Sequence, residues 1–259
     1  MAEGKSHVHI VGSSVNIPDM TATLKAKVTV SDEQQADPKR LASVYDGMAK
    51  KFIDGGLDLE AIAAMRQYFD LSHAGTPMHL NEPSHYHVTV FMTSQPHTIR
   101  PYPFDPEWVE PAAQAPAEWA TPSAITLTRE QEAMRTAATA RSPPDFAVHR
   151  LLMADSGTLL LTSVERGSQL VSLRKALRAA FPGAPPRQST IVHSSIGRIL
   201  GTAQLDAATL QAVQEVCDRW TGRLQGHRWS ASGLSHVQEE TFTTVEGPAM
   251  FLPFRDATP

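Results

Sequence analysis

Two short stretches of the chain place a histidine and a hydroxyl side chain two residues apart. In HYHVTV, residues 85–90, His87 precedes Thr89, and in HSSI His193 precedes Ser195. β-Branched or aliphatic residues fill most alternate positions, and successive side chains of a strand point to opposite faces. Each stretch therefore predicts a strand with an apolar face and a face that carries an imidazole beside a hydroxyl.

Two imidazoles that face one another suit the hydrolysis of a phosphodiester without a metal ion. One neutral histidine takes a proton from the attacking water, and one protonated histidine supplies a proton to the departing sugar oxygen. We expect His87 and His193 to form this acid–base pair and Thr89 and Ser195 to bind the phosphate oxygens. The pattern leaves open which histidine is the acid, and we expect no cofactor and no metal.

Four neighbouring residues are candidates for substrate binding. His85 shares the face of the first motif and either contacts substrate or lies at the exposed start of its strand. By alternation Gly197 lies on the face of the second motif, where the missing side chain would let a ligand approach. Arg198 points to the opposite face, as a surface ion-pair partner or as a strand-end residue that turns back toward phosphate. Phe91 falls beyond Thr89 on the same face, where a base could stack.

Composition and charge narrow the class of partner. Acidic residues outnumber basic ones by 27 to 23, so no overall positive field would hold a long polyanion. The beginning of the chain lacks the apolar run of a secretory signal, and no run of eighteen apolar residues occurs. The single cysteine, Cys217, favours a reducing compartment. We therefore expect a cytoplasmic monomer that acts on a small nucleotide or an RNA end and binds neither long nucleic acid nor membrane.

Periodicity and punctuation predict an α+β fold with helices packed on antiparallel sheet. Asp58, Asp206 and a capping box of Thr128 with Gln131 indicate three helix starts. The expected helices cover 38–54, 58–69, 129–140, 167–181 and 206–220; the expected strands are two within 146–165 around the turn 155–157, the two histidine stretches, and two within 229–254 joined at 246–248.

Two parts of the chain stand apart from this pattern. Prolines every few residues between 101 and 124 exclude a helix or a central strand, so we interpret 101–145 as an insertion or a connection between lobes. Residues 1–37 remain unplaced beside a domain that covers 38–259. A faint duplication, MRQYF at 65–69 and LRAAF at 177–181, places a helix end before each histidine stretch and suggests two similar lobes.

On HVTV at 87–90 and HSSIGRI at 193–199, the chain resembles the two-histidine (2H) phosphoesterases. These include bacterial RNA 2′,3′-cyclic phosphodiesterases and plant cyclic phosphodiesterases. The strand and helix within 157–181 and the closing EGPAMFLPF are similar to the family as well. The resemblance implies a bilobal fold, with two antiparallel sheets, helices on their outer faces and pseudo-twofold lobes around a central cleft, and it implies the same roles for the two histidines and two hydroxyls.

Three other interpretations remain open. The same residues would serve a catalytically silent module that binds a nucleotide or an RNA end, or an enzyme that ligates RNA through a 2′,5′ linkage. A metal site would take His85, His87 and a distant carboxylate as ligands, but it leaves the two hydroxyls unexplained. A turnover assay with cyclic nucleotides separates the enzyme from the binding module.

Overall fold

A computed structural model describes residues 7–10, 37–66, 78–93, 104, 124–186, 188–239 and 247–256. Its helices are α3 (Pro38–Gly55), α4 (Leu59–Arg66), α5 (Ala124–Thr139), α6 (Gln169–Ala180) and α7 (Ala207–Leu224), with a 3₁₀ turn at Pro83–His85. Its strands are β1 (His7–Ile10), β2 (Met78–Leu80), β3 (Phe91–Met92), β4 (Asp145–Met153), β5 (Thr158–Glu165), β6 (His193–Ile199), β7 (Arg228–Ser230), β8 (Gly233–Glu239) and β9 (Ala249–Pro253).

The strands form two sheets whose described pairings are all antiparallel. The four-stranded sheet has the order β3-β1-β8-β9, and the five-stranded sheet has the order β2-β6-β5-β4-β7. The predicted α+β class is therefore confirmed. One histidine stretch leads into β3 of the first sheet, and the other forms β6 of the second.

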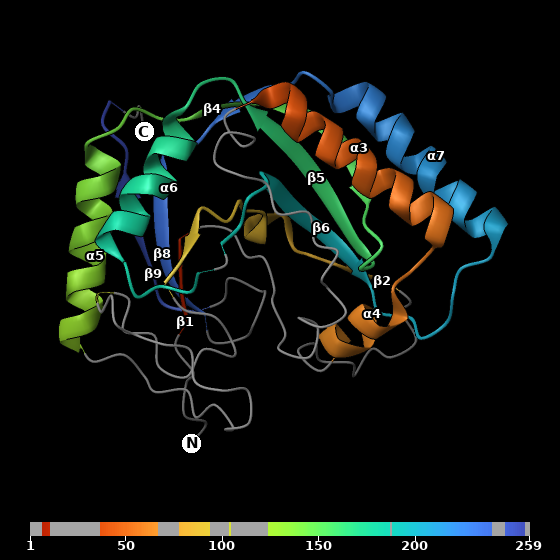
Figure 1. Cartoon of the computed structure of the whole chain (residues 1–259), viewed down its shortest axis with the longest axis horizontal. Helices are drawn as coiled ribbons and strands as arrows, with labels where there is room; N and C mark the ends of the chain where they lie inside the picture. Colours follow the sequence, from red (N-terminus) through yellow and green to blue (C-terminus); the bar gives the residue numbers. More distant parts are fainter. Residues whose placement is uncertain are drawn as a thin grey trace.

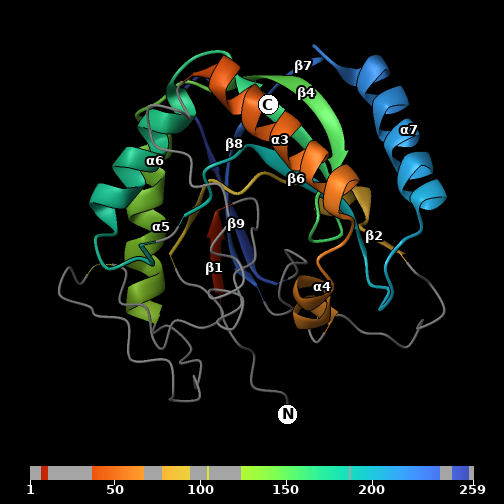
Figure 2. The same cartoon turned by 45° about the vertical axis from the view of Figure 1, so that its right-hand side comes forward.

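Each sheet is accompanied by two of the long helices. Helices α3 and α7 pack against β4, whereas α5 packs against β8 and β9 and α6 packs against α5. Figure 1 shows α3 and α7 beside the five-stranded sheet and α5 and α6 on the other side of the molecule. After the 45° turn of Figure 2, α5 and α6 still lie together, apart from α7.

Three helix starts follow directly from aspartate caps. Asp37 accepts a hydrogen bond from the backbone N–H of Lys39 at 3.0 Å and precedes a proline at the first helical position of α3. Asp58 accepts from the Ala61 N–H at 2.9 Å, and Asp206 accepts from the Thr209 N–H at 2.7 Å. The starts predicted at the Asp58 and Asp206 caps are confirmed, as is the start predicted at residue 38, whose cap Asp37 was not predicted.

Two predictions about local structure are wrong. Helix α5 begins at Ala124, so Thr128 and Gln131 lie inside the helix and do not form its cap. The stretch HYHVTV is not a strand, because the 3₁₀ turn ends at His85 and residues 86–90 adopt no regular element before the short β3.

The other strand predictions agree with the structure. Strands β4 and β5 form the expected hairpin, the second histidine stretch forms β6, and β8 pairs with β9. Of the segment 101–145, the structure describes Phe104 and residues 124–145, which form α5 and lead into β4. Of the unplaced segment 1–37, it describes β1 and residue 37.

An apolar stripe runs along α7 and is only partly buried. Cys217 is buried, and Leu210 and Val213 pack against the same core cluster. Val216 and Trp220 are 41% and 42% exposed. The stripe is therefore wider than the surface that packs on β4. In the part of the chain that the structure describes, no helix is long and apolar enough to cross a membrane.

Candidate functional site

The two histidine motifs lie on neighbouring backbone segments. We call residues 87–92 the first segment and residues 188–195 the second segment. Arg174 of α6 lies between them: its Nη2 donates hydrogen bonds to the Thr89 carbonyl and to the Ile191 carbonyl, each at 3.1 Å. One guanidinium nitrogen therefore holds both segments.

Two further side chains bridge the segments at either end. The Gln188 amide donates to the Met92 carbonyl at 2.9 Å and accepts from the Met92 N–H at 2.8 Å. The Ser194 hydroxyl donates to the His87 carbonyl at 2.7 Å. Residue numbers thus rise along one segment as they fall along the other, so the segments run antiparallel, with His87 and His193 at the same end.

These bridges explain why the first segment is not a regular strand. A sheet ladder needs backbone partners for each N–H and C=O group. The carbonyls of His87, Thr89 and Val90 instead accept hydrogen bonds from the side chains of Ser194 and Arg174. The sequence predicts extended backbone here, and the partners of that backbone come from distant positions.

A tyrosine hydroxyl fixes the start of β6. The Val192 N–H donates to the Tyr45 hydroxyl at 3.0 Å, and that hydroxyl lies 2.9 Å from the Ser163 carbonyl, to which it donates. The Tyr45 hydroxyl of α3 therefore lies between β5 and Val192, the residue before His193. Burial raises the pKa of Tyr45 well above its usual value, so the hydroxyl stays protonated and can donate.

His87 is half-buried, and its ring orientation is fixed by its own chain. Its Nδ1 is hydrogen-bonded to the His85 carbonyl. A carbonyl oxygen can only accept, so Nδ1 carries the proton, and in the neutral ring Nε2 is the nitrogen with the lone pair. His85, predicted to contact substrate or to lie exposed, is half-buried in the 3₁₀ turn and orients His87 through its carbonyl.

The other three motif residues are buried. His193 and Ser195 are each 7% exposed, and Thr89 is 1% exposed. The Thr89 hydroxyl has no hydrogen-bond partner among the described residues. Buried hydroxyls are normally hydrogen-bonded, and an exception calls for an explanation. The structure thus brings the two motif backbones together and places three of the four functional groups below the surface.

A β-bulge changes which side chains share a face of β6. Ser195 pairs with Leu160, but Gly197 pairs with Leu159, so Ile196 is the extra residue. Arg198 pairs with Thr158, which lies two residues from Leu160 on β5. Arg198 therefore lies on the Ser195 face, and its prediction to point away by simple alternation is wrong.

Arg198 is buried against β5. Its Nη1 donates to the Thr158 hydroxyl at 2.9 Å, and burial lowers the pKa of Arg198 to about 10. The guanidinium still carries its charge at neutral pH. The surface ion-pair interpretation of this arginine is therefore not supported by its position.

Gly197 and Phe91 take structural positions rather than open ones. A Cβ on Gly197 would lie 2.6 Å from the His79 carbonyl of β2, so the missing side chain allows two strands to approach closely. The bulge also moves Gly197 off the face predicted for it. Phe91 is 1% exposed and stacks on Phe181 with ring centroids 5.9 Å apart, so its ring belongs to the core.

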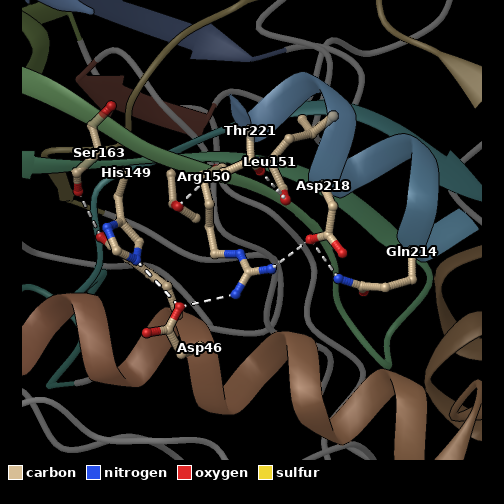
Figure 3. Close-up of polar contacts among 10 residues, drawn as sticks. Asp46, His149, Arg150, Leu151, Ser163, Gln214, Asp218 and Thr221 are labelled. Atoms are coloured by element: carbon tan, nitrogen blue, oxygen red, sulfur yellow. Dashed lines mark hydrogen bonds and ion pairs between the residues drawn. The ribbon is translucent and has the colours of Figure 1, made fainter. Parts of the chain in front are cut away.

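His193 is in a cross-strand row that leads to a charged network. His193 pairs with Thr162, and Thr162 pairs with Arg150. The Arg150 guanidinium contacts Asp46 of α3 at 2.9 Å and Asp218 of α7 at 3.3 Å, as Figure 3 shows. The sequence pattern did not reveal this network, which ties the sheet to both of its helices.

Within the described ranges, no group of three or more histidine, cysteine, aspartate or glutamate side chains could hold a metal ion. Comparison with known proteins adds no assignment. No family model, no curated protein and no solved structure matches the chain. The case for a function therefore depends on the residues and their arrangement.

Proposed function

We propose that the protein is a phosphoesterase of the two-histidine type, which hydrolyses small cyclic phosphates or 2′,5′-phosphodiesters of nucleotides or RNA ends without a metal ion. The observation that carries the proposal is the antiparallel alignment of the two motif segments. They are distant in sequence and belong to different sheets, yet Arg174, Gln188 and Ser194 hold them side by side.

The proposed mechanism assigns one task to each group. Neutral His87, with Nδ1–H bonded to the His85 carbonyl, accepts at Nε2 the proton of the attacking water. The water oxygen bonds to phosphorus as the bond from phosphorus to the departing ribose oxygen breaks. Protonated His193 gives its proton to that oxygen, and the hydroxyls of Thr89 and Ser195 donate to the non-bridging phosphate oxygens.

The wider features of the proposal follow from the same arrangement. We assign the two sheets, each with two helices and one motif, to two lobes related by a pseudo-twofold axis around the site. The charge of −4 favours a nucleotide or an RNA end over long RNA. A cytoplasmic monomer is the form in which we expect the protein to act.

The Thr89 hydroxyl gives independent support. A buried hydroxyl without a partner costs about 1–3 kcal/mol, and Thr89 has no partner among the described residues. A bound phosphate oxygen would accept its hydrogen bond. The cost would then be recovered only when substrate is present, which is the behaviour expected of a binding group rather than of a core residue.

The first experiment measures turnover of a panel of 2′,3′-cyclic nucleotides and 2′,5′-dinucleotides in the presence of EDTA. Wild-type protein should release product with a bell-shaped pH profile, because one histidine must be neutral and the other protonated. His87→Ala and His193→Ala should each lower kcat by at least about 100-fold, with unchanged far-UV circular dichroism. Turnover that disappears with EDTA, or that survives both substitutions, would contradict the proposal.

A matched pair of variants separates function from folding. Thr89→Val should lower kcat without loss of stability, because it removes a hydroxyl that has no described partner in the apo protein. Thr221→Val is the control. The Thr221 hydroxyl, on the distant helix α7, is hydrogen-bonded to the backbone N–H and carbonyl of Leu151 at 3.0 and 3.2 Å. This variant should therefore lose stability and keep kcat. The opposite outcome would show that the Thr89 hydroxyl is only structural.

The alternative function is a silent module that binds a nucleotide or an RNA end with the same residues. It predicts saturable binding of a 2′,3′-cyclic nucleotide in calorimetry, weakened by Thr89→Val, with no product after hours of incubation. RNA ligation is distinguished by a new 2′,5′ linkage in the product.

A further inference from the structure

Arg174 occupies an unusual position for an arginine. It projects from α6, whose neighbouring Leu170, Leu173 and Leu177 are buried, and it is itself only 9% exposed. Its guanidinium donates to four backbone carbonyls: Thr89 and Val90 in the first segment, at 3.1 and 3.2 Å, and Thr190 and Ile191 in the second segment, at 3.5 and 3.1 Å.

The planar shape of the Arg174 guanidinium fixes the distance between the two segments. Its five N–H bonds lie in one plane at fixed angles. The two hydrogens of Nη2 point to Thr89 and Ile191 in different segments, so the segments can neither close up nor separate without losing a bond. A lysine would keep the charge, but its ammonium has no fixed fork and cannot reproduce all four contacts.

Two-histidine chemistry depends on the distance between the two segments that Arg174 bridges. Thr89 is the hydroxyl residue of the first motif, and Ile191 lies two residues before His193. Reacting groups must be placed within a fraction of an ångström, and a misplacement of about 1 Å can cost about 100-fold in rate. A bridge between these two carbonyls therefore acts on the distance between the two imidazoles.

We infer that Arg174 is a positioning residue, which sets the separation of the two histidine segments through their backbone carbonyls. The inference rests on the proposed function for its effect on turnover. Arg174 acts on the motif residues through the main chain and does not itself need to touch substrate.

A second arginine offers a matched control. Arg141 also bridges two elements through carbonyls, since it donates to Ala137 of α5 at 2.7 Å and to Ser172 of α6 at 3.3 Å. Neither carbonyl belongs to a motif segment. Arg174→Lys and Arg141→Lys are therefore the same chemical change in two similar bridges, of which one spans the proposed site.

Steady-state kinetics test the inference where the wild-type protein turns over a cyclic nucleotide. Arg174→Lys should lower kcat by at least about tenfold, leave KM within about threefold and change the pH profile of kcat, because the two imidazoles lose their alignment. Arg141→Lys should leave kcat and its pH profile unchanged. Equal effects of the two substitutions would overturn the inference.

A second measurement does not depend on turnover. Ring nitrogen resonances of His87 and His193, assigned with the two alanine variants, are recorded by NMR for each lysine variant. Both rings should shift in Arg174→Lys, and neither should shift in Arg141→Lys. Unmoved rings in Arg174→Lys would overturn the inference. If the variants show the expected pattern of shifts but the wild-type protein shows no turnover, only the proposed phosphoesterase activity is refuted.

Discussion

Replacement of Tyr45 by phenylalanine tests the structure at the point where α3 meets the second segment. The ring is fully buried, and its hydroxyl is the partner of the Val192 N–H at 3.0 Å and of the Ser163 carbonyl at 2.9 Å. Phenylalanine fills nearly the same volume, so the change removes the hydrogen bonds and little else. Two backbone groups inside the sheet then lose their partner.

The expected loss of stability follows from those two groups. A buried donor or acceptor left without a partner costs about 1–3 kcal/mol. The Val192 carbonyl keeps its bond from the Ser163 N–H at 2.9 Å, so only the Val192 N–H and the Ser163 carbonyl contribute. We therefore expect Tyr45→Phe to lower the free energy of unfolding by about 2–6 kcal/mol, and Tm by about 2–4 °C for each kcal/mol.

Urea unfolding followed by circular dichroism measures this loss, and hydrogen exchange at the Val192 amide locates it. Tyr86→Phe is the control, because Tyr86 is 41% exposed and an exposed substitution should stay within about 0.5 kcal/mol. The reasoning is refuted if Tyr45→Phe is as stable as that control, or if the Val192 amide remains equally protected. Neither result depends on what the protein does.

Three other outcomes follow from buried or half-buried groups. Burial raises the pKa of Cys217 to about 11, so its thiol should react slowly with Ellman's reagent at pH 7.5 in native protein and rapidly in urea; fast stoichiometric reaction of native protein would contradict this. Burial raises the pKa of Glu130 above its usual 4.5, so the native state binds this proton more tightly than the unfolded state and stability falls as pH rises above that value. Glu130→Gln should remove this part of the fall, and parallel stability curves from urea unfolding at several pH values would disprove it. Gln188→Glu keeps an acceptor for the Met92 N–H but places a carboxylate oxygen against the Met92 carbonyl, so the variant should be less stable at pH 7 than at pH 4 relative to wild type; a difference in unfolding free energy that does not change with pH would count against the described contact.

Local signals predicted much of the secondary structure. The predicted caps Asp58 and Asp206 act on N–H groups three residues away, so both partners are visible in a short window of sequence. The hairpin of β4 and β5 is similarly local, because its turn and its apolar residues are contiguous. The α+β class follows from these elements.

The first histidine stretch shows where such reasoning fails. Its β-branched residues and alternation favour a strand, but a strand needs a partner along its length. Its carbonyls are taken by Arg174 and Ser194, which lie far along the chain. The pattern predicted a strand, and it could not predict that side chains would replace the ladder.

The candidate site was misjudged for a related reason. Alternation places Gly197 beside Ser195 only if the strand is regular, and the bulge at Ile196 reverses the assignment from that point. The bulge is a feature of the pairing between β5 and β6, which are separated along the chain by α6. This pairing decides the face on which Arg198 lies, and residues close to Arg198 in the sequence do not reveal it.

The polarity of β5 and β6 differs between the two faces of the sheet. The register places a row of side chains on one face, all at most 8% exposed and nearly all polar: Thr158, Leu160, Thr162, His193, Ser195 and Arg198. On the opposite face, Leu159 and Leu161 are half-buried and pack against the core cluster that contains Phe52 of α3 and Cys217 of α7. Burial of polar groups costs free energy unless they are satisfied, and part of the row is satisfied internally: Arg198 donates to the Thr158 hydroxyl and Thr162 donates to the Arg150 carbonyl, each at 2.9 Å. The row therefore joins these hydrogen-bonded groups to His193 and Ser195, the two side chains of the second motif that the proposed function uses.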